Sequence, residues 1–258
     1  MPQYDYLYLG DNARAPYGPR SFEVVYAFTL QAVRHLFDLG CPLVILACNT
    51  ASAKALRTIQ QHDLPIINAL SNNEGREGIQ KNVLGVVRPT VEVVGTLTKT
   101  RHIGIMATEG TIRSHTYELE LAKLSPDIVV TGQACPMWVP IIENGEANSP
   151  GADYFVRQYI DQLLERDPLI DAIILGCTHY PLLLDKIRSY TPAHIRLIPQ
   201  GEYVATSLKD YLRRHTEMET CITRGATARF LTTEQPESFA SSATRFLGED
   251  ILAEHTVL

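Results

Sequence analysis

Short runs of apolar and β-branched residues alternate along the chain with longer segments whose apolar positions recur at helical spacing. Runs that are apolar at nearly every position are typical of strands covered on both faces, as in parallel sheets with crossover helices. Such runs predict strands at 4–9, 42–47, 65–70, 83–87, 102–107, 127–132, 171–176 and 194–199. Because strands and helices alternate, the predicted fold class is α/β, with doubly wound parallel sheets.

Capping residues, prolines and glycines mark the expected ends of these elements. Ser21 predicts the start of a helix that runs from Phe22 to about Phe37. A domain boundary is expected at or just after the polar, glycine-containing segment 72–78. The other predicted boundaries are helix ends at Leu124 and Arg166, before Ser125-Pro126 and Asp167-Pro168, and a second loop at 143–153.

Composition and charge exclude several classes of function. The 258 residues are 45% hydrophobic and 20% charged, which is globular composition, and no run of about 18 apolar residues is present to span a bilayer. The net charge is −6 and no basic stripe is interleaved with aromatics, so nucleic acid is not an expected partner. The N-terminus lacks the pattern of a secretory signal, which makes a reducing cytoplasm the expected compartment. The five cysteines show neither a CxxC pair nor zinc-ligand spacing, so no metal site is expected.

Two of the predicted strands end on cysteine. Residues 47–52 read ACNTAS and residues 176–181 read GCTHYP, so each strand brings a thiol, Cys48 or Cys177, to its carboxyl end. Amide, hydroxyl or imidazole side chains follow directly, and a helix is predicted from Ala51 to about Gln61. Because ligands bind at that edge of open α/β sheets, both segments are candidates for one site.

The chemistry of such a pair is acid–base catalysis. A helix N-terminus stabilises an anion, so the pKa of each thiol is expected to be lowered. Two opposed thiols suit the inversion of a carbon acid, in which one thiolate removes a proton from one face and the other thiol delivers a proton to the opposite face. A disulfide oxidoreductase would place its cysteines in CxxC, and a cysteine protease would use one cysteine. Packing as a small core residue is the alternative for each thiol.

The neighbours of these thiols allow more than one interpretation. His179 follows Cys177 by two residues and is predicted to polarise the Cys177 thiol or to supply a proton beside it. The alternatives are a histidine that caps the next helix and half of a metal site, for which no second pair with ligand spacing is evident. Cys41 and Cys135 precede prolines and are interpreted as packed thiols, and Cys221 has no informative neighbours.

Four separated segments resemble, in order, the signatures of the cofactor-independent glutamate racemases of the aspartate/glutamate racemase superfamily. They are GDNARAPYG (10–18), ACNTAS (47–52), GTIRS (110–114) and GCTHYPLL (176–183), within a resemblance from Tyr4 to Gly248. It implies two pseudo-symmetric α/β domains, formed by 1–80 with 202–258 and by 81–201, and an active site in the cleft between them. It also implies an isomerase that interconverts L- and D-glutamate without a cofactor, supplies D-glutamate for peptidoglycan, and is frequently a homodimer.

The same resemblance implies roles for single residues. Cys48 and Cys177 match the two catalytic cysteines, each the base for one enantiomer and the acid for the other. His179 matches a histidine that assists the second cysteine, and Glu143 falls where the family has an assisting acid, with a solvated loop carboxylate as the alternative. The implied substrate-binding residues are Tyr17, Gly18, Asn49, Thr50, Thr108, Thr111, Thr178 and His179. Each threonine taken alone also fits an ordinary helix cap.

The chain departs from the family pattern at its beginning. Glutamate racemases begin with a strand that ends in Asp-Ser-Gly, whereas MPQYDYLYLGD resembles the start of the family's second strand. The first strand is therefore expected to be missing from this sequence, which would leave a sheet edge uncovered beside the strand that carries Cys48. The alternatives that follow are a truncated or inactive relative that acts as a binding protein, and an aspartate-specific racemase.

Overall fold

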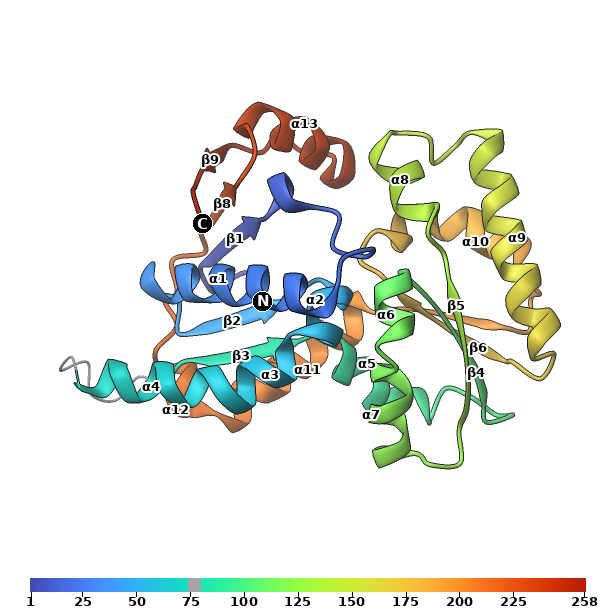
Figure 1. Cartoon of the computed structure of the whole chain (residues 1–258), viewed down its shortest axis with the longest axis horizontal. Coiled ribbons are helices and arrows are strands. Elements are labelled where there is room, and N and C mark those ends of the chain that lie inside the picture. Colours follow the sequence, from blue (N-terminus) through green and yellow to red (C-terminus); the bar gives the residue numbers. More distant parts are fainter. Residues whose placement is uncertain (74–79) are drawn as a thin grey trace. The chain divides into compact units, whose positions relative to one another are not determined.

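The computed structural model describes residues 1–73 and 80–258 and divides into two compact units (Figure 1). Unit 1 comprises Met1–Leu46, Lys54–Leu84 and Ala205–Leu258, and unit 2 comprises Ala47–Ala53 and Gly85–Val204. The predicted loop at 72–78 lies, from residue 74 onward, outside the described residues. No helix within the described ranges is long and apolar enough to cross a membrane.

Unit 2 is built on a four-stranded sheet whose strands are all parallel. Its spatial order is β5-β4-β6-β7. The strands are β4 (His102–Ala107), β5 (Val129–Ala134), β6 (Ala172–Gly176) and β7 (Arg196–Pro199). Every residue of β6 is buried, as expected for a central strand covered on both faces.

Helices pack on both faces of this sheet. Ile103 and Ile105 of β4 lie in one cluster with Val91 of α5 and Leu121 of α7. Gly104 points to the opposite face, where an added Cβ would lie 2.7 Å from Leu163 of α9. This alternation is that of a doubly wound sheet. The helices of unit 2 are α2 (Asn49–Lys54, as far as Ala53), α5 (Val87–Val94), α6 (Glu109–Arg113), α7 (Thr116–Leu124), α8 (Trp138–Glu143), α9 (Pro150–Arg166), η3 (Tyr180–Leu183) and α10 (Leu184–Tyr190).

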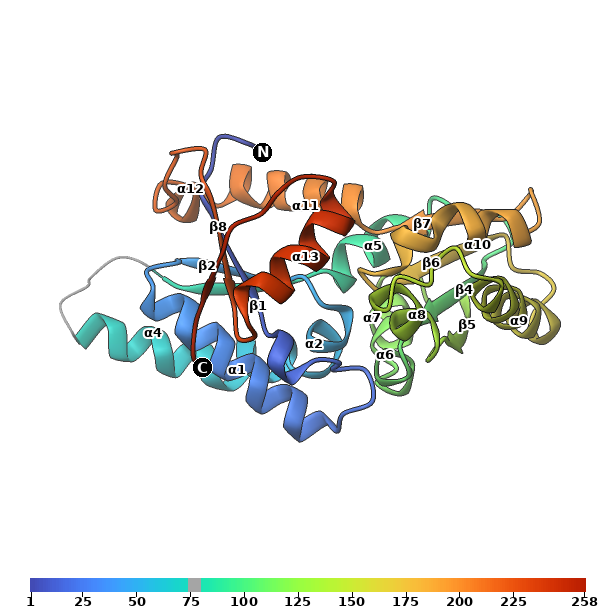
Figure 2. The same cartoon turned by 90° about the horizontal axis from the view of Figure 1, so that it is seen from above.

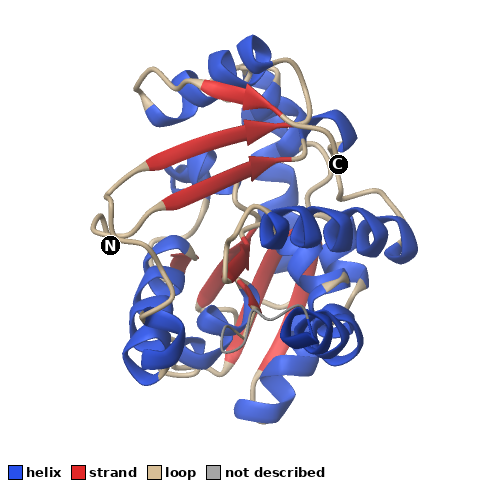
Figure 3. Cartoon of the chain, turned by 90° about the vertical axis from the view of Figure 1, so that its left-hand side faces the viewer, coloured by secondary structure: helices blue, strands red, loops and turns tan. Residues whose placement is uncertain are grey.

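Unit 1 holds two smaller sheets. The first has the order β1-β8-β9, all parallel, and its strands are β1 (Tyr6–Gly10), β8 (Ala228–Thr232) and β9 (Ala253–His255) (Figure 3). In the second, β2 (Leu43–Leu46) pairs with β3 (Asn82–Gly85). Among the described residues, β1 and β2 each carry a strand partner on one side only.

The helices of unit 1 cover these sheets. Val33 and Phe37 of α1 pack with Val44 of β2 in a buried cluster. Helix α13 contacts β8 and β9 and is drawn beside β8 in Figure 2. The helices are η1 (Asn12–Arg14), α1 (Phe22–Asp38), α3 (Leu56–Thr58), η2 (a π-helix, Ile59–Asp63), α4 (Leu64–Asn73), α11 (Gly201–Arg214, from Ala205), α12 (Thr216–Glu219) and α13 (Pro236–Leu247).

The predicted α/β class with parallel sheets is confirmed, and several helix ends are confirmed with it. The Ser21 hydroxyl accepts a hydrogen bond from Val24 N at 3.3 Å and caps α1. Helices α7 and α9 end at Leu124 and Arg166, before the predicted breakers.

One predicted strand is wrong. Residues 65–70 lie in α4, where Leu64 and Ile67 pack against the core but Ile66 and Leu70 are 60% and 59% exposed. The buried positions are therefore three residues apart, which is helical spacing, although the run of letters is apolar throughout. Pro65 directly follows the π-helix turn η2 and Leu64, an irregular part of the helix of the kind at which a residue without a backbone N–H is accommodated.

Other boundaries also differ from the sequence-based expectation. The helix expected over 51–61 consists of α2, α3 and the start of η2, and Val87 of the predicted strand 83–87 begins α5 instead. The loop expected at 143–153 is shorter, because Glu143 ends α8 and Pro150 already begins α9, whose first turn accepts a proline.

Candidate active site

The carboxyl edge of the unit 2 sheet gathers polar and thiol side chains. In the parallel register, Ala107 of β4 lies opposite both Ala134 of β5 and Gly176 of β6. The residues that follow these strand ends, Thr108, Cys135 and Cys177, therefore leave the sheet side by side. The expectation that Cys177 lies at a strand's carboxyl end is met, at the edge where ligands bind in open α/β sheets.

The segment that carries Cys48 is held against this same unit. Ala47–Ala53 follows β2 in sequence, yet it clusters with unit 2. Each of the bonds that hold it has a hydroxyl side chain on at least one side. They are Tyr117 Oη to Asn49 Oδ1 (2.8 Å), Thr50 Oγ1 with Thr108 Oγ1 (2.9 Å), Val86 N to Ser52 Oγ (3.3 Å) and Thr116 Oγ1 to Ala53 O (3.1 Å). Cys48 and Cys177 thus belong to one unit.

The side chains of Cys177, His179 and Glu143 form a chain of three groups. His179 Nδ1 lies 3.8 Å from Cys177 Sγ, and His179 Nε2 lies 2.5 Å from Glu143 Oε1. Glu143 is the last residue of α8, so its carboxylate stands at a helix end and not in a loop. A carboxylate that accepts the Nε2 hydrogen leaves Nδ1 free to exchange a proton with the thiol.

The pKa values of the two thiols contradict the expectation from sequence. Burial raises the pKa of Cys177 to about 12, because desolvation outweighs the N–H groups of His179 and Tyr180, which lower it. Desolvation likewise raises the pKa of Cys48, against the lowering effect of the Ala51 and Thr50 peptide groups, although the residue retains exposed surface. The predicted lowering is therefore wrong for the free protein. A Cys48 thiolate would also raise the pKa of Cys177, so the two thiols are close enough to interact electrostatically.

Three threonine hydroxyls form a cluster beside Cys48. Thr50 Oγ1 lies 2.9 Å from Thr108 Oγ1 and 3.4 Å from Thr111 Oγ1, and Thr108 and Thr111 are 3.1 Å apart. Thr108 also caps α6 by accepting a bond from Thr111 N, so the helix-cap interpretation holds for this residue. Hydroxyls of this kind can bind a carboxylate without placing a positive charge beside the thiols.

Asn49 is buried and only half of its amide is bonded. Its side-chain oxygen accepts from Tyr117, whereas its Nδ2 has no hydrogen-bond partner among the described residues. Behind Asn49 lie Tyr117 and Gln200, two residues that were not predicted from the sequence. Gln200 Nε2 donates a hydrogen bond to Tyr117 Oη at 2.8 Å. Gln200 directly follows β7, so its place at a strand's carboxyl end was the available signal.

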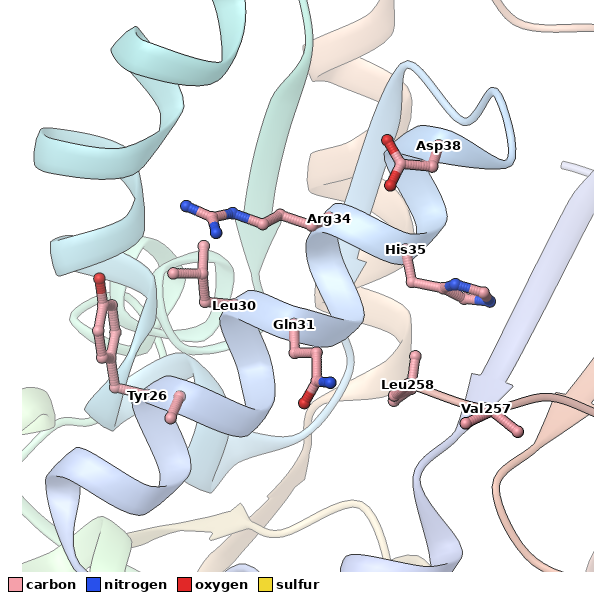
Figure 4. A pocket seen from close by; sticks show the side chains of 9 residues that line it. Tyr26, Leu30, Gln31, Arg34, His35, Asp38, Val257 and Leu258 are labelled. Carbon is pink, nitrogen blue, oxygen red and sulfur yellow. The ribbon is translucent and has the colours of Figure 1, made fainter.

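The remaining predicted residues lie elsewhere. Tyr17 and Gly18 belong to unit 1, between η1 and α1, and the Tyr17 hydroxyl donates to Asp11. Thr178 is exposed, next to Cys177. A cavity of about 490 Å³ between α1 and the C-terminal residues of unit 1 contains none of the predicted residues (Figure 4).

Of the other three cysteines, Cys135 lies at the same sheet edge but is buried. Cys135 is 1% exposed, and its thiol donates to Gln133 O at 3.6 Å. Cys41 and Cys221 are half-buried, and all five cysteines are free. Within 1–73 and 80–258, no group of three or more His, Cys, Asp or Glu side chains could hold a metal ion.

The raised thiol pKa predicts that the fold loses stability in alkali. Between the ordinary thiol pKa of 9.0 and about 12, the native Cys177 keeps a proton that the unfolded chain releases. The free energy of unfolding should therefore be undiminished by this group below about pH 9 and fall by ~1.4 kcal/mol per pH unit above it. Urea unfolding of wild type and of Cys177→Ser from about pH 8 to about pH 11 measures the difference. The free energy of unfolding of Cys177→Ser should decline less steeply with pH than that of wild type. Cys221→Ser, a change at a half-buried cysteine, is the control and should retain the wild-type slope. Equal slopes for wild type and Cys177→Ser would contradict the raised pKa of Cys177.

Comparison with known proteins decides the family. The family model described as Asp/Glu/Hydantoin racemase matches residues 1–206. The chain belongs to the Asp/Glu/hydantoin racemase family. It is 39% identical to a glutamate racemase from Dinoroseobacter shibae over 261 residues, which cover 97% of this chain and 89% of that protein.

Solved structures of family members show the same fold. Glutamate racemase isoform RacE1 from Bacillus anthracis is 31% identical with a TM-score of 0.83, covering 100% of this chain and 90% of its own. Glutamate racemase from Francisella tularensis, solved in complex with D-glutamate, is 29% identical with a TM-score of 0.81, covering 100% and 89%. The resemblance that four short sequence segments indicated therefore extends over nearly the whole length of this chain.

Proposed function

We propose that this protein is a glutamate racemase, an isomerase that interconverts L- and D-glutamate through two cysteines and supplies D-glutamate for peptidoglycan. The observation that carries the proposal is the pair of thiols in unit 2, with Cys177 directly after β6, Cys48 two residues after β2, and the His179–Glu143 pair beside Cys177. Two thiols that interact electrostatically fit a reaction in which protons are exchanged at one carbon. Relatives with this name, at up to 39% identity over nearly the whole chain, support the substrate.

The reaction moves one proton off the α-carbon and another onto it. A thiolate at Cys48 or Cys177 takes the α-proton from one face of glutamate, leaving a carbanion whose charge extends into the α-carboxylate. The thiol on the other face then delivers its proton, which inverts the centre. The opposite enantiomer uses the same two groups with exchanged roles, because each product state leaves the former base protonated and the former acid as thiolate.

Forming the thiolate is the difficult step, because burial opposes it. At Cys177, His179 Nδ1 can take the thiol proton while Glu143 stabilises the imidazolium through Nε2, so the charge is created as an ion pair. The substrate ammonium group would lower the pKa of both thiols further by bringing a positive charge near them. At Cys48, the Thr50 hydroxyl and the peptide groups of Thr50 and Ala51 stabilise the anion.

The substrate is held by neutral donors. Thr50, Thr108 and Thr111 offer hydroxyls, and Asn49 offers an unbonded amide hydrogen, at the edge of the sheet where the thiols lie. Such donors bind carboxylates without placing a positive charge beside the thiols. Tyr17, Gly18, Thr178 and His179 complete the proposed substrate contacts on the strength of the family resemblance.

The setting of the reaction belongs to the same proposal. Because a thiol base works only while reduced, we place the enzyme in the cytoplasm, where thiols stay reduced. We further propose a homodimer, and two α/β domains at 1–80 with 202–258 and at 81–201.

The test is the circular dichroism of L-glutamate and of D-glutamate over time with the 258-residue chain, beside the same measurement on the two enantiomers of aspartate. Decay of both glutamate signals toward zero is the expected result, because enantiomers have equal free energies in water. Faster decay of aspartate would reassign the substrate. A folded protein that binds glutamate without changing its signal would be a binding protein built on the racemase fold.

A further inference from the structure

We infer that Gln200 and Tyr117 act as positioning residues that fix the direction in which the Asn49 amide points, so that its N–H hydrogens face the substrate. The inference rests on the proposed function, because it concerns how the substrate of that site is held. Neither residue is placed to touch the substrate: Tyr117 is 1% and Gln200 7% exposed, and both reach the site through Asn49.

The direction of the hydrogen bonds follows from the chemistry of Gln200. The Gln200 Nε2 amide can only donate, and it lies 2.8 Å from Tyr117 Oη, 3.0 Å from Thr90 Oγ1 and 3.2 Å from Val86 O. The Tyr117 hydroxyl therefore accepts from Gln200, and its single hydrogen remains for Asn49 Oδ1 at 2.8 Å. A tyrosine that must donate selects the oxygen of the Asn49 amide and turns Nδ2 to the other side.

The consequence is seen at the nitrogen of the Asn49 amide. Asn49 is 2% exposed, yet its Nδ2 makes no hydrogen bond within the described part of the chain. A buried donor left unpaired is costly, so its retention indicates a partner that arrives from outside. Beside it lie the hydroxyls of Thr50 and Thr108, which suit the same anionic ligand. A carboxylate oxygen of the substrate is the group that would satisfy them.

The surroundings of the chain of bonds make its direction hard to reverse. Burial raises the pKa of Tyr117, so the hydroxyl stays protonated and retains its role as a donor. Gly176, directly before Cys177, leaves room for that hydroxyl: an added Cβ would lie 3.4 Å from Tyr117 Oη and 3.1 Å from Ala107 Cβ. The bonds from Gln200 to Val86 and Thr90 hold it in place when Tyr117 is altered.

Two substitutions separate this role from mere packing. Tyr117→Phe removes the hydroxyl and retains the ring, so the Asn49 amide loses what orients it. Gln200→Glu replaces the donor with a carboxylate that accepts the Tyr117 hydrogen, and the tyrosine oxygen is then left to accept from Asn49 Nδ2. Each change takes the N–H group away from the substrate. Because the second acts through the first, Gln200→Glu should add little in the Tyr117→Phe background.

The measurement is calorimetric binding of D-glutamate to the full chain carrying Cys48→Ser and Cys177→Ser, which prevents turnover during the titration. Tyr117→Phe and Gln200→Glu should each weaken binding by about tenfold, the effect of a lost hydrogen bond to a charged group. In the chain with intact cysteines, KM should rise by a similar factor with a smaller change in kcat. Tyr190→Phe is the matched control, since it removes a hydroxyl that bonds Asp153 away from the sheet edge.

The outcomes distinguish the two proposals. Binding by Tyr117→Phe as tight as by Tyr190→Phe, in folded protein with normal near-ultraviolet dichroism, would overturn the positioning role and leave the racemase proposal intact. Fully additive losses in the double variant would also overturn it, because independent effects are what packing alone produces. Failure of the parent protein to bind or racemise glutamate would overturn both proposals at once.

Discussion

Replacing Cys48 or Cys177 with serine is expected to lower the racemisation rate by about 10³-fold from either enantiomer, within the range that a positioned acid or base contributes. Serine matches cysteine in shape, but its hydroxyl is far too weakly acidic to serve as the base near neutral pH. Because the reaction needs a base on one face and an acid on the other, either variant alone should stop inversion in both directions. Polarimetric progress curves from pure L- and pure D-glutamate measure this loss.

The same variants should still exchange the α-hydrogen of one enantiomer with solvent. Which enantiomer is exchanged identifies the face of the substrate on which the remaining thiol works. A single remaining thiol can remove the α-proton of one enantiomer and return a proton to the same face. In D₂O, proton NMR should therefore show exchange of the α-hydrogen with only one enantiomer in Cys48→Ser and with the other in Cys177→Ser. Cys41→Ser and Cys221→Ser serve as controls with normal rates. Exchange of the same enantiomer in both catalytic variants would refute the assignment of the thiols to opposite faces.

The second large effect is expected at His179. His179→Gln should lower kcat/KM by about 10²-fold, because glutamine cannot take the proton of a thiol whose pKa burial raises to about 12. The loss should be the same from L- and from D-glutamate, since an equilibrium constant of one ties the two values of kcat/KM together. The rate of the variant should also go on rising with pH beyond the point at which the wild-type rate levels off, because its thiolate must form without a neighbouring base.

Two further variants test whether the role of His179 depends on Glu143 and whether the loss is specific to this histidine. Glu143→Gln should produce a smaller loss, and a small additional one in the His179→Gln background, because the carboxylate acts through the imidazole. His194→Gln changes an exposed histidine outside the site and should leave the rate unchanged. A normal rate for His179→Gln across the whole pH range would show that the thiol is deprotonated by another group.

The α/β fold was predictable because its signals are local. Strands such as His102–Ala107 are apolar at nearly every position, and Ser21, Pro126 and Pro168 mark helix ends by mechanisms that act within a few residues. Residues 65–70 show the limit of this reasoning. Their letters fit a buried strand, and only the packing of Leu64 and Ile67, with Ile66 and Leu70 facing outward, makes the segment helical.

The candidate site likewise contains features that local sequence patterns predict and features that depend on packing between distant parts of the chain. Cys48 and Cys177 were predicted because a thiol at a strand's carboxyl end is a local pattern, and Glu143 was predicted only through the family resemblance. The direction of the thiol pKa shifts was predicted wrongly, since the effect of a helix N-terminus can be read from sequence but the depth of burial cannot. Tyr117 and Gln200 act on Asn49 from positions 68 and 151 residues away along the chain, a separation at which sequence patterns carry no information.

The hydrogen bonds that hold Ala47–Ala53 to unit 2 also set an order of events during synthesis. Cys48 leaves the ribosome early, whereas Thr108, Tyr117, Cys177 and Gln200 follow only as the chain lengthens by about another 150 residues, at ~5–20 residues per second. During that interval the thiol has its ordinary pKa and is open to oxidants. Once the segment is in place, desolvation keeps both thiols protonated. Completion of the fold therefore suppresses the thiolate form of both sulfurs, on which their oxidation depends, although Cys48 keeps exposed surface, and the thiolate is most abundant in the nascent chain.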